Sequence, residues 1–375
     1  MKEGWEKYSL IDICNVTTGK HDANHAEMNG KYRFYTCSSQ YVYCNTKRYE
    51  GECIILPGNG INVGESYYYN GEFDAYQRTY VIDKIDKRII PMYLFYHLQN
   101  NWKSEGVAKQ YGSATNYIKI GNFKDYIVKM PQSLSEQQSI VDYLDSAFAK
   151  IDAMKTNAEN ALNEAKALFQ ASLKEMLEPK EGWEEKKLGE VGTFIRGGNF
   201  SKKDFVEGGF PCIHYGQIHT KLGVATYKHL SCVPASMVKK DRCASRGDLV
   251  IAVTSEDDEG SCKCTAWMAD YDAYVGGHAA ILKHSLNPIF VSYYFKAARF
   301  QKAKLEYTHG FKVVEISPKD IAKIPIAYPS PSKQQSIVDT LDSLKSKVDR
   351  LQANYEKISQ ECDALKQAIL RQVFE

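Results

Sequence analysis

Two long segments of the chain repeat apolar residues at alternating steps of three and four positions. The first lies between Pro131 and Pro179, the second extends from Pro331 toward the C-terminus, and neither contains Gly or Pro. Such steps place the apolar side chains on one stripe of a helix, and a stripe sustained over several heptads is typical of a coiled-coil seam. We therefore predict two long helices, at residues 132–178 and 332–375, that pair with each other. The predicted seam consists of Ile140, Leu144, Ile151, Met154, Ile337, Leu341, Leu344, Val348, Leu351, Tyr355, Ile358 and Leu365.

The segments outside these helices have a different pattern. Short apolar runs such as Cys53–Leu56 and Asp248–Ala252 are separated by clusters of Gly and Asn. Runs of this length between turn residues favour β-strands. Residues 1–131 and 179–331 are therefore predicted to form two similar domains of mixed α/β structure. The predicted fold class is α+β, with one long helix after each domain.

The first half of the chain resembles the second half. Lys2–Glu6 recurs as Lys180–Glu184, and Gln137–Asp145 recurs as Gln334–Asp342 with eight of nine residues identical. This repeat is far longer than the roughly 20–50 residues of solenoid repeats. It indicates tandem duplication of a domain together with its helix.

Composition places the chain among ordinary globular proteins. Apolar residues make up 43% and charged residues 25% of its 375 residues. No apolar run reaches the ~18–20 residues of a membrane span, and the first residues lack the apolar stretch of a signal peptide. We therefore expect a cytoplasmic protein without membrane contact. The ten cysteines are expected to be reduced thiols, and a zinc site at the closely spaced pair Cys262 and Cys264 is a minor alternative.

The net charge of +2 hides an uneven distribution. Residues 136–178 hold 4 Lys or Arg against 8 Asp or Glu, and residues 332–375 hold 7 of each. Residues 1–135 hold 16 basic against 14 acidic residues, and residues 179–331 hold 21 against 17. The predicted domains are thus mildly basic, which is a weak indication of phosphate binding.

Loops within the domains carry residue types suited to nucleic acids. The stretches Gly106–Asn116 and Tyr307–Lys312 occupy equivalent positions before each helix. Gln, Asn, Arg, Lys and His side chains can reach base edges, and Ser, Thr and Lys can hold phosphates. An ordinary surface loop explains each stretch equally well. The candidate DNA-contacting residues are Lys20, Asn59, Asn62, Tyr67, Tyr68, Gln77, Arg78, Lys109, Gln110, Tyr111, Ser113, Thr115 and Asn116 in the first domain and Arg196, His214, Tyr215, Gln217, Thr254, Ser255, His278, His309, Phe311 and Lys312 in the second.

Catalytic signatures are missing from the sequence. It contains no GxxxxGK[ST] phosphate loop, no HExxH helix and no GxSxG elbow. The pairs His21/His25 and His214/His219 have no carboxylate and cysteine context in the sequence, and the acidic run at 256–259 is typical of a solvated loop. We therefore predict no catalytic residue, no metal site and no cofactor in this chain.

The layout resembles the specificity (S) subunit of type I restriction-modification systems. A Gly-Trp box opens each domain, and Gln-Gln-Ser-Ile-Val-Asp followed by Leu-Asp opens each helix, at Gln137 and Gln334. The resemblance covers nearly the whole chain. It implies two target-recognition domains that each read one half of a split site in double-stranded DNA. It also implies two helices that pack antiparallel as a spacer.

The same resemblance implies the partners. Two methyltransferase subunits, which carry S-adenosylmethionine and methylate adenine, would dock on this chain, and a motor-nuclease subunit would join them. The chain itself would be non-catalytic. The implied division is a first recognition domain at 1–131, a first spacer helix at 132–178, a second recognition domain at 179–331 and a second spacer helix at 332–375.

Two other functions stay open at this stage. One is a coiled-coil scaffold whose two β-rich domains bind protein or peptide. The other is a standalone enzyme, which the missing catalytic motifs disfavour.

Overall fold

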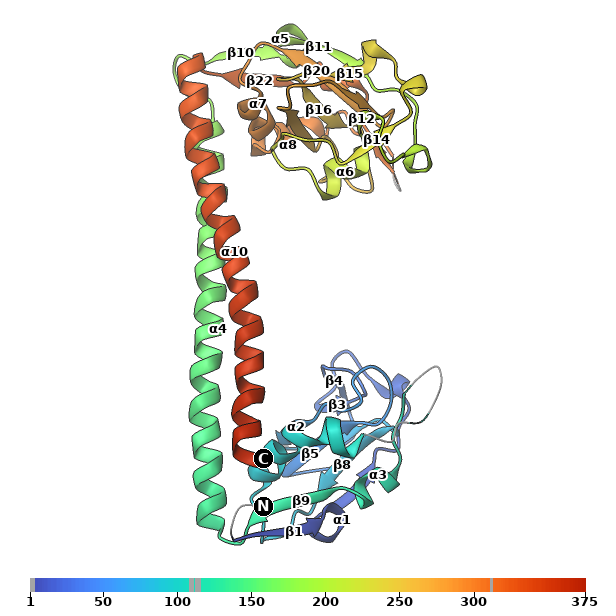
Figure 1. Ribbon diagram of the computed structural model, residues 1–375, viewed down its shortest axis with the longest axis vertical. Helices are drawn as coiled ribbons and strands as arrows, with labels where there is room; N and C mark the ends of the chain where they lie inside the picture. The colour runs from blue at the N-terminus through green and yellow to red at the C-terminus, as the bar shows by residue number, and fades with distance from the viewer. Residues whose placement is uncertain (1–3, 108–110, 112–115, 311–312) are drawn as a thin grey trace. The chain divides into compact units, whose positions relative to one another are not determined.

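The computed structural model describes residues 4–107, 111, 116–310 and 313–375. They divide into two compact units, Met1–Glu159 with Asn354–Glu375 and Asn160–Ala353. Each unit contains one β-rich block, here called the first and the second block, and a segment of both long helices (Figure 1). The long helices are α4 (Leu134–Leu177) and α10 (Pro331–Phe374).

The first block is built from short strands and short helices. Its strands form a sheet in the order β2-β8-β5-β6, a smaller sheet in the order β4-β3-β7, and the pair β1-β9. Only the β3–β7 pairing is parallel among these described strands. The strands are β1 (Trp5–Ser9), β2 (Asn15–Thr18), β3 (Tyr32–Tyr35), β4 (Val42–Cys44), β5 (Glu52–Pro57), β6 (Tyr67–Asn70), β7 (Phe73–Ala75), β8 (Thr79–Asp83) and β9 (Ile127–Pro131). The helices are α1 (Leu10–Ile13), η1 (Ala23–His25), α2 (Pro91–Asn101), η2 (Trp102–Gly106) and α3 (Ile120–Lys124).

Strand β5 lies between two apolar cores, which explains its unbroken apolar run. Ile54 and Leu56 belong to the core that contains residues of α2. Cys53 and Ile55 belong to a second core, together with Phe73 of β7. Successive side chains of a strand point to opposite faces of its sheet, so a strand that is covered on both faces must be apolar throughout.

The second block repeats this arrangement and adds strands. Its larger sheet has the order β11-β20-β16-β18-β13, its smaller sheet the order β14-β12-β19-β15, and β10-β22 and β17-β21 form pairs. The strands are β10 (Glu184–Lys187), β11 (Gly192–Arg196), β12 (Phe210–Ile213), β13 (Ala225–Thr226), β14 (Ser231–Val233), β15 (Cys243–Ala244), β16 (Leu249–Ala252), β17 (Thr254–Ser255), β18 (Cys264–Trp267), β19 (Ala273–Val275), β20 (Ala279–His284), β21 (Val314–Glu315) and β22 (Pro325–Tyr328). The helices are α5 (Leu188–Val191), η3 (Lys202–Asp204), α6 (Tyr215–Thr220), η4 (Ala235–Met237), η5 (Lys240–Arg242), α7 (Pro288–Tyr294), α8 (Ala298–Lys304) and α9 (Pro318–Ile321).

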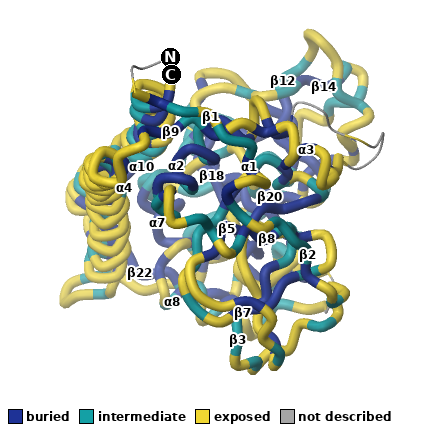
Figure 2. Tube along the Cα trace, turned by 90° about the horizontal axis from the view of Figure 1, so that it is seen from below, coloured by how far each residue is buried: buried dark blue, intermediate teal, exposed yellow. Residues whose placement is uncertain are grey.

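The strand pairings confirm that the two blocks are copies of one design. The order β2-β8-β5-β6 corresponds to β11-β20-β16-β18, and β4-β3-β7 corresponds to β14-β12-β19. Even the parallel pairing recurs, since β12 runs parallel to β19 as β3 does to β7. The predicted α+β fold with two similar mixed α/β domains is therefore confirmed. Figure 2 shows the buried strands β18 and β20 in dark blue and the outward side of α4 in yellow.

The two long helices pack antiparallel, as predicted. In the first unit Lys366 Nζ donates to Asp152 at 2.6 Å, and Lys155 Nζ lies 3.4 Å from Asp363, so the numbering rises along α4 as it falls along α10. In the second unit Lys166 Nζ donates to Gln352 at 2.9 Å. Helix α10 begins one residue before its predicted start at 332, and α4 begins two residues after its predicted start at 132. None of the described helices combines the length and the apolar character that crossing a membrane requires.

The predicted seam is wrong at Met154 and Leu365. Their exposed fractions are 58% and 47%, whereas Leu162 on α4 is 3% exposed. The buried stripe of α4 keeps a heptad spacing, but the row beside Ile151 contains Lys155, Leu162 and Phe169 and lies one position after the row that contains Met154. Adjacent positions of an α-helix are turned by about 100° from each other, so the row that contains Met154 lies outside the buried stripe. On α10 the next residue, Lys366, is half-buried in place of Leu365.

The other predicted seam residues lie on the inward side of the helices. Leu144, Ile151, Ile337, Leu341 and Val348 are buried. The half-buried members are Ile140, Leu344, Leu351, Tyr355 and Ile358.

Candidate nucleic-acid interface

Backbone hydrogen bonds draw four segments of the first block together at one end of its larger sheet. The Gly19 N–H donates to the Thr79 carbonyl at 3.3 Å, and the Gly58 N–H donates to the Arg78 carbonyl at 2.9 Å. The Ile118 N–H donates to the Gly58 carbonyl at 3.0 Å. We call this surface the first loop edge. It comprises residues 18–20, 57–62, 76–79, 111 and 116–119.

The second block has the same three hydrogen bonds at the equivalent end of its sheet. The Gly197 N–H donates to the Ala279 carbonyl at 2.9 Å, and the Val253 N–H donates to the His278 carbonyl at 3.0 Å. The Ile316 N–H donates to the Val253 carbonyl at 3.0 Å. This surface is the second loop edge. It comprises residues 196–202, 253–257, 276–278, 309–310 and 313–316.

A glycine begins each loop edge because the backbones approach closely there. A Cβ atom on Gly19 would lie 1.7 Å from the Ala75 carbonyl oxygen, and one on Gly197 would lie 2.1 Å from the Gly276 carbonyl oxygen. Only glycine permits such an approach. The two glycines therefore allow the same close backbone approach at equivalent positions of the two blocks.

The first loop edge brings several predicted residues around one hollow. Asn59, Gln77 and Arg78 line a hollow of about 430 Å³, and Lys119 lies beside them. The Gln77 and Arg78 side chains are exposed. Tyr111 extends the same surface, because its backbone and that of Tyr117 exchange two N–H···O hydrogen bonds, both at 3.0 Å. Lys20 and Asn116 also lie exposed on this edge.

Three other candidates of the first block have structural roles. Tyr67 and Tyr68 lie on β6, half-buried against the two apolar cores of the block. Burial raises the pKa of both phenols, and Tyr68 also donates to Glu52. Asn62 Nδ2 donates to the Cys37 carbonyl at 2.8 Å, which holds two loops together.

The second loop edge gathers its candidates around two adjoining hollows. Arg196, Tyr215 and His278 line one of about 360 Å³. Tyr215, Thr254 and Ser255 line the other, of about 530 Å³. The rings of Tyr215 and His278 lie 5.0 Å apart, and His278 Nδ1 is 3.0 Å from the Thr254 hydroxyl oxygen.

His214 and Gln217 hold the start of α6. The Gly216 N–H donates to His214 Nδ1 at 3.1 Å, and the His214 N–H donates to the Gln217 side-chain oxygen at 3.0 Å. His214 is 7% exposed, and this burial lowers the pKa of its imidazole. These contacts position Tyr215, the first residue of α6.

His309 and Arg196 converge on Glu315. The backbones of His309 and Glu315 exchange two hydrogen bonds, at 3.0 and 2.8 Å, and the Arg196 guanidinium donates to the Glu315 carboxylate at 3.0 Å. The His309–Glu315 pairing corresponds to the Tyr111–Tyr117 pairing of the first block. His309 is exposed on the second loop edge. The remaining candidates, Lys109, Gln110, Ser113, Thr115, Phe311 and Lys312, lie outside the described residues.

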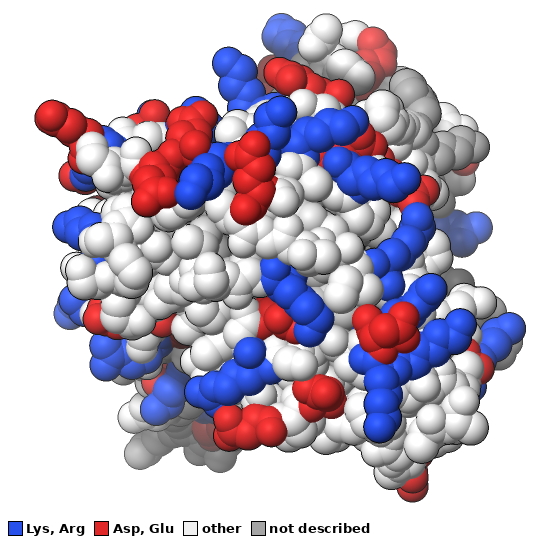
Figure 3. Space-filling view, turned by 90° about the horizontal axis from the view of Figure 1, so that it is seen from above, with Lys and Arg blue, Asp and Glu red and all other residues white. Residues whose placement is uncertain are grey.

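The two loop edges differ in charge. Among its described residues the first has Lys20, Arg78 and Lys119 and no acidic residue. The described part of the second has Arg196 and Lys202 against Glu256, Asp257 and Glu315. Elsewhere on the second block basic and acidic side chains lie next to one another, as on the face over β10 and β11 (Figure 3). The first loop edge is therefore the more favourable surface for a phosphate backbone.

Sequence reasoning missed Lys119, Tyr117 and Lys202. Lys119 Nζ lies 4.3 Å from the ring centre of Tyr111 and 5.7 Å from that of Tyr117, in cation–π contacts. Lys202 lines the larger hollow of the second loop edge. An alignment of the two halves of the chain that pairs Tyr117-Ile118 with Glu315-Ile316 would have pointed to Lys119 and Tyr117.

The cysteine pair at 262 and 264 is not part of a group with metal-ligating geometry among the described residues. Both side chains are buried, and burial raises the pKa of each thiol to about 12. Among the described residues the group with metal-ligating geometry is a different one, His21, His25 and Asp74.

Comparison with known proteins identifies the class of this chain. The family model of the type I restriction modification DNA specificity domain matches residues 2–164 and 180–360. The chain therefore belongs to the type I restriction modification DNA specificity family and carries its domain twice. The resemblance seen in the sequence is confirmed.

Individual relatives match part of the chain. The type I restriction enzyme EcoDI specificity subunit of Escherichia coli is 34% identical over 169 residues, 45% of this chain and 37% of that protein. The type I restriction enzyme StySPI specificity subunit of Salmonella potsdam is 26% identical over 196 residues, 51% of this chain and 42% of that protein. The aligned segments thus span less than half the length of these curated relatives.

Solved structures share the whole fold. The HsdS subunit from Thermoanaerobacter tengcongensis has a TM-score of 0.57 and 19% identity, covering 100% of this chain and 97% of that one. A chain from a structural study of complex assembly and conformational transition of the type I R-M system has a TM-score of 0.74 and 18% identity, covering 100% and 98%. At these identities the likeness shows the fold alone.

Proposed function

We propose that this chain is the DNA-specificity subunit of a type I restriction-modification complex and that each loop edge reads one half of a bipartite site. One observation carries the proposal. The same three backbone hydrogen bonds build both loop edges, whereas the side chains on them differ. Recognition of two different half-sites requires two surfaces that share one backbone arrangement and carry different side chains.

The side chains on the loop edges suit direct readout of double-stranded DNA. Arg78 and Gln77 are exposed side by side, and Arg pairs with guanine and Gln with adenine in the major groove. On the second loop edge the acidic Glu256 and Asp257 are suited to accept from the cytosine amino group. Lys20 and Lys119 are placed to contact phosphates, which orient a protein on DNA without reading its sequence.

The long helices supply the frame for two readers. Proteins that bind two half-sites need them at a set spacing, and we infer that paired α4 and α10 set the unread spacer. The domain division at 1–131, 132–178, 179–331 and 332–375 follows from this proposal.

The proposal places the chemistry on partner subunits. We infer that two methyltransferase subunits bind this chain and carry S-adenosylmethionine, and that a motor-nuclease subunit joins them. The chain itself then needs no catalytic residue. A cytoplasmic location follows, because the DNA substrate is there.

Exchange of one block tests the proposal. The chain is produced with a methyltransferase subunit encoded beside it, and adenine methylation of the host genome is mapped by sequencing. We expect methylation at a two-part site, and replacement of residues 1–131 by the equivalent block of a relative is expected to change one half only. Methylation of a single contiguous site, or a change in both halves, contradicts two independent readers. Association with a protein partner and no salt-sensitive DNA binding would favour the scaffold function instead.

A further inference from the structure

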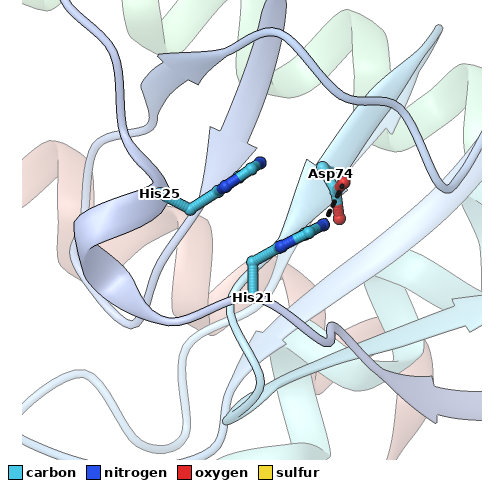
Figure 4. Close-up of side chains that lie close together, drawn as sticks. All are labelled: His21, His25 and Asp74. Atoms are coloured by element: carbon cyan, nitrogen blue, oxygen red, sulfur yellow. Dashed lines mark ion pairs between the residues drawn. The ribbon is translucent and has the colours of Figure 1, made fainter.

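Two histidines and an aspartate of the first block meet at the end of β7. His21 lies two residues before the short helix η1, His25 is the last residue of η1, and Asp74 is the central residue of β7. Figure 4 shows both imidazole rings extending from the loop at 21–25 in the same direction, with Asp74 at the end of the His21 ring. One ligating atom from each residue lies within 4.8 Å of the others.

The two imidazoles form a stacked pair in front of the carboxylate. Their ring centres are 3.7 Å apart, and their planes differ by 7°. His21 Nε2 lies 3.5 Å from Asp74 Oδ2. Asp22, between the two histidines, caps η1 by accepting from the Asn24 N–H at 3.4 Å.

The Asp74 carboxylate is buried and has neutral hydrogen-bond partners. Its side chain is 1% exposed, Oδ1 accepts from the Ala75 N–H at 2.8 Å, and Oδ2 accepts from the Thr46 hydroxyl at 2.7 Å. Thr46 Oγ1 also lies 2.7 Å from His25 Nε2. A buried carboxylate is costly unless a positive charge compensates it.

We propose that His21, His25 and Asp74 bind a divalent transition-metal ion of the Zn²⁺ class. Two imidazole nitrogens and one carboxylate oxygen are ligands that such ions favour, and three protein ligands leave a fourth position open. The ion supplies a positive charge next to the buried Asp74 carboxylate. This inference concerns the first block alone and does not depend on DNA recognition.

The imidazole rings must rotate to reach the required geometry, because the bonds of a tetrahedral ion diverge by about 109° whereas the two ring planes are nearly parallel. Ligand atoms about 2.0–2.1 Å from a tetrahedral ion lie roughly 3.3 Å from one another. His21 Nε2 and Asp74 Oδ2 are already 3.5 Å apart. His25 must exchange its contact with Thr46 for the ion, and its ring already faces the same side as that of His21.

The ion would fasten the loop at 21–25 to the first loop edge. The Gln77 N–H donates to the His21 carbonyl at 2.9 Å, and its side-chain amide lies 3.4 Å from Asp22 Oδ2. Asp74 lies on β7, and Gln77 follows it three residues later in the turn between β7 and β8. Metal binding therefore stabilises the turn that presents Gln77 and Arg78.

Metal titration of the full, untagged chain tests the proposal. After chelation and dialysis, Zn²⁺ binding is measured by calorimetry, and Co²⁺ is followed by its visible absorption. We expect one saturable equivalent and a rise in the melting temperature of the wild-type chain. His21→Gln and His25→Gln are expected to weaken binding about 100-fold or more, since loss of an outer-shell partner alone costs 10–100-fold.

The variants are chosen so that failure to fold cannot imitate the result. The His21 side chain is 38% exposed, so its replacement leaves the core intact. His229→Gln, in the second block beside Tyr271, is the matched control and is expected to bind Zn²⁺ like the wild type. No saturable binding by the wild type, or equal affinity in the wild type and both cluster variants, overturns the proposal.

Discussion

Gln334 Oε1 accepts a hydrogen bond from the backbone N–H of Asn287 at 2.9 Å, and Gln334 Nε2 donates to the Pro329 carbonyl at 2.8 Å. The first copy has the same clamp. Gln137 Oε1 accepts from the Ile90 N–H at 2.9 Å, and its Nε2 donates to the Pro131 carbonyl at 2.9 Å. Both glutamines are buried. The repeated Gln-Gln motif thus joins the first turn of each long helix to the segment that precedes α2 or α7.

Replacement of the clamping glutamine should destabilise its unit. Gln137→Leu leaves a buried N–H and a buried carbonyl without their partner, and each such group costs about 1–3 kcal/mol. We expect a loss of about 2–6 kcal/mol in the free energy of unfolding, measured by urea denaturation of the full chain. The neighbouring Gln138, exposed and bonded within the helix to Asp142, is the control. Equal stability of Gln137→Leu and Gln138→Leu would show that the clamp is dispensable.

The register of the helix seam gives a second prediction. Leu162 is 3% exposed and Met154 is 58% exposed, although the predicted seam contains Met154 and omits Leu162. We expect Leu162→Ala to lower the free energy of unfolding by about 2–5 kcal/mol and Met154→Ala by at most about 0.5 kcal/mol. Thermal unfolding of both variants measures the difference. The reverse order of effects would restore the predicted seam.

Much of the fold could be predicted because its signals are long. The helices and the repeat rest on patterns that extend over dozens of residues, so single exceptions do not hide them. The row of α4 that joins Ile151 in the seam could not be predicted, because two adjacent heptad rows both carry apolar residues. Apolar residues at both Met154 and Leu162 fit one pattern or the other.

The candidate site was predicted less well because its residues meet across long separations. Ile118 and Gly58 share a hydrogen bond although 60 positions separate them, and no local pattern announces it. His21 and Asp74 are equally remote, and Asp74 lies in a strand where a buried carboxylate has no sequence signature. Tyr67 and Tyr68 show how little residue type alone decides, since a tyrosine in a loop-rich block is most often a packing residue and both pack partly against the apolar cores.

Burial of His97 makes the first unit sensitive to acid. His97 is fully enclosed between Tyr126 and Phe374, and burial lowers the pKa of its imidazole to about 3 from the ordinary 6.5. The unfolded chain therefore binds a proton between pH 6.5 and 3 that the folded chain does not. The free energy of unfolding should fall by about 1.4 kcal/mol per pH unit from this group as the pH drops through that window.

Urea denaturation at pH 7, 6 and 5 measures this dependence. His97→Gln is expected to reduce the slope of the free energy of unfolding against pH by the equivalent of about one proton. This change in slope does not depend on how the substitution affects stability at pH 7. His229→Gln, outside the first unit, should leave the slope unchanged. An unaltered slope in His97→Gln would mean that this imidazole titrates alike in the folded and unfolded chain.

The charge difference between the loop edges predicts different roles for Arg78 and His278. Arg78 lies on the edge whose described residues are basic, and it is exposed beside Gln77. If it contacts guanine, Arg78→Ala should weaken binding of the cognate DNA by about 1–3 kcal/mol and relax base preference in one half-site. If it contacts a phosphate, affinity should fall for all sequences, and the slope of log affinity against log salt should decrease by about 0.9. Fluorescence anisotropy of the complex at several salt concentrations separates the two.

The matched variants assign each effect to one loop edge. Arg88→Ala removes an exposed arginine of the same block that is paired with Asp86 away from the loop edge, and it should leave DNA affinity unchanged. His278→Ala, at the position equivalent to Arg78, should relax base preference in the other half-site only. Because Val253 and Gly58 make the same backbone contact beneath these two side chains, equivalent positions should read equivalent places in their half-sites. Loss of preference in one and the same half-site for both variants would contradict recognition by two separate loop edges.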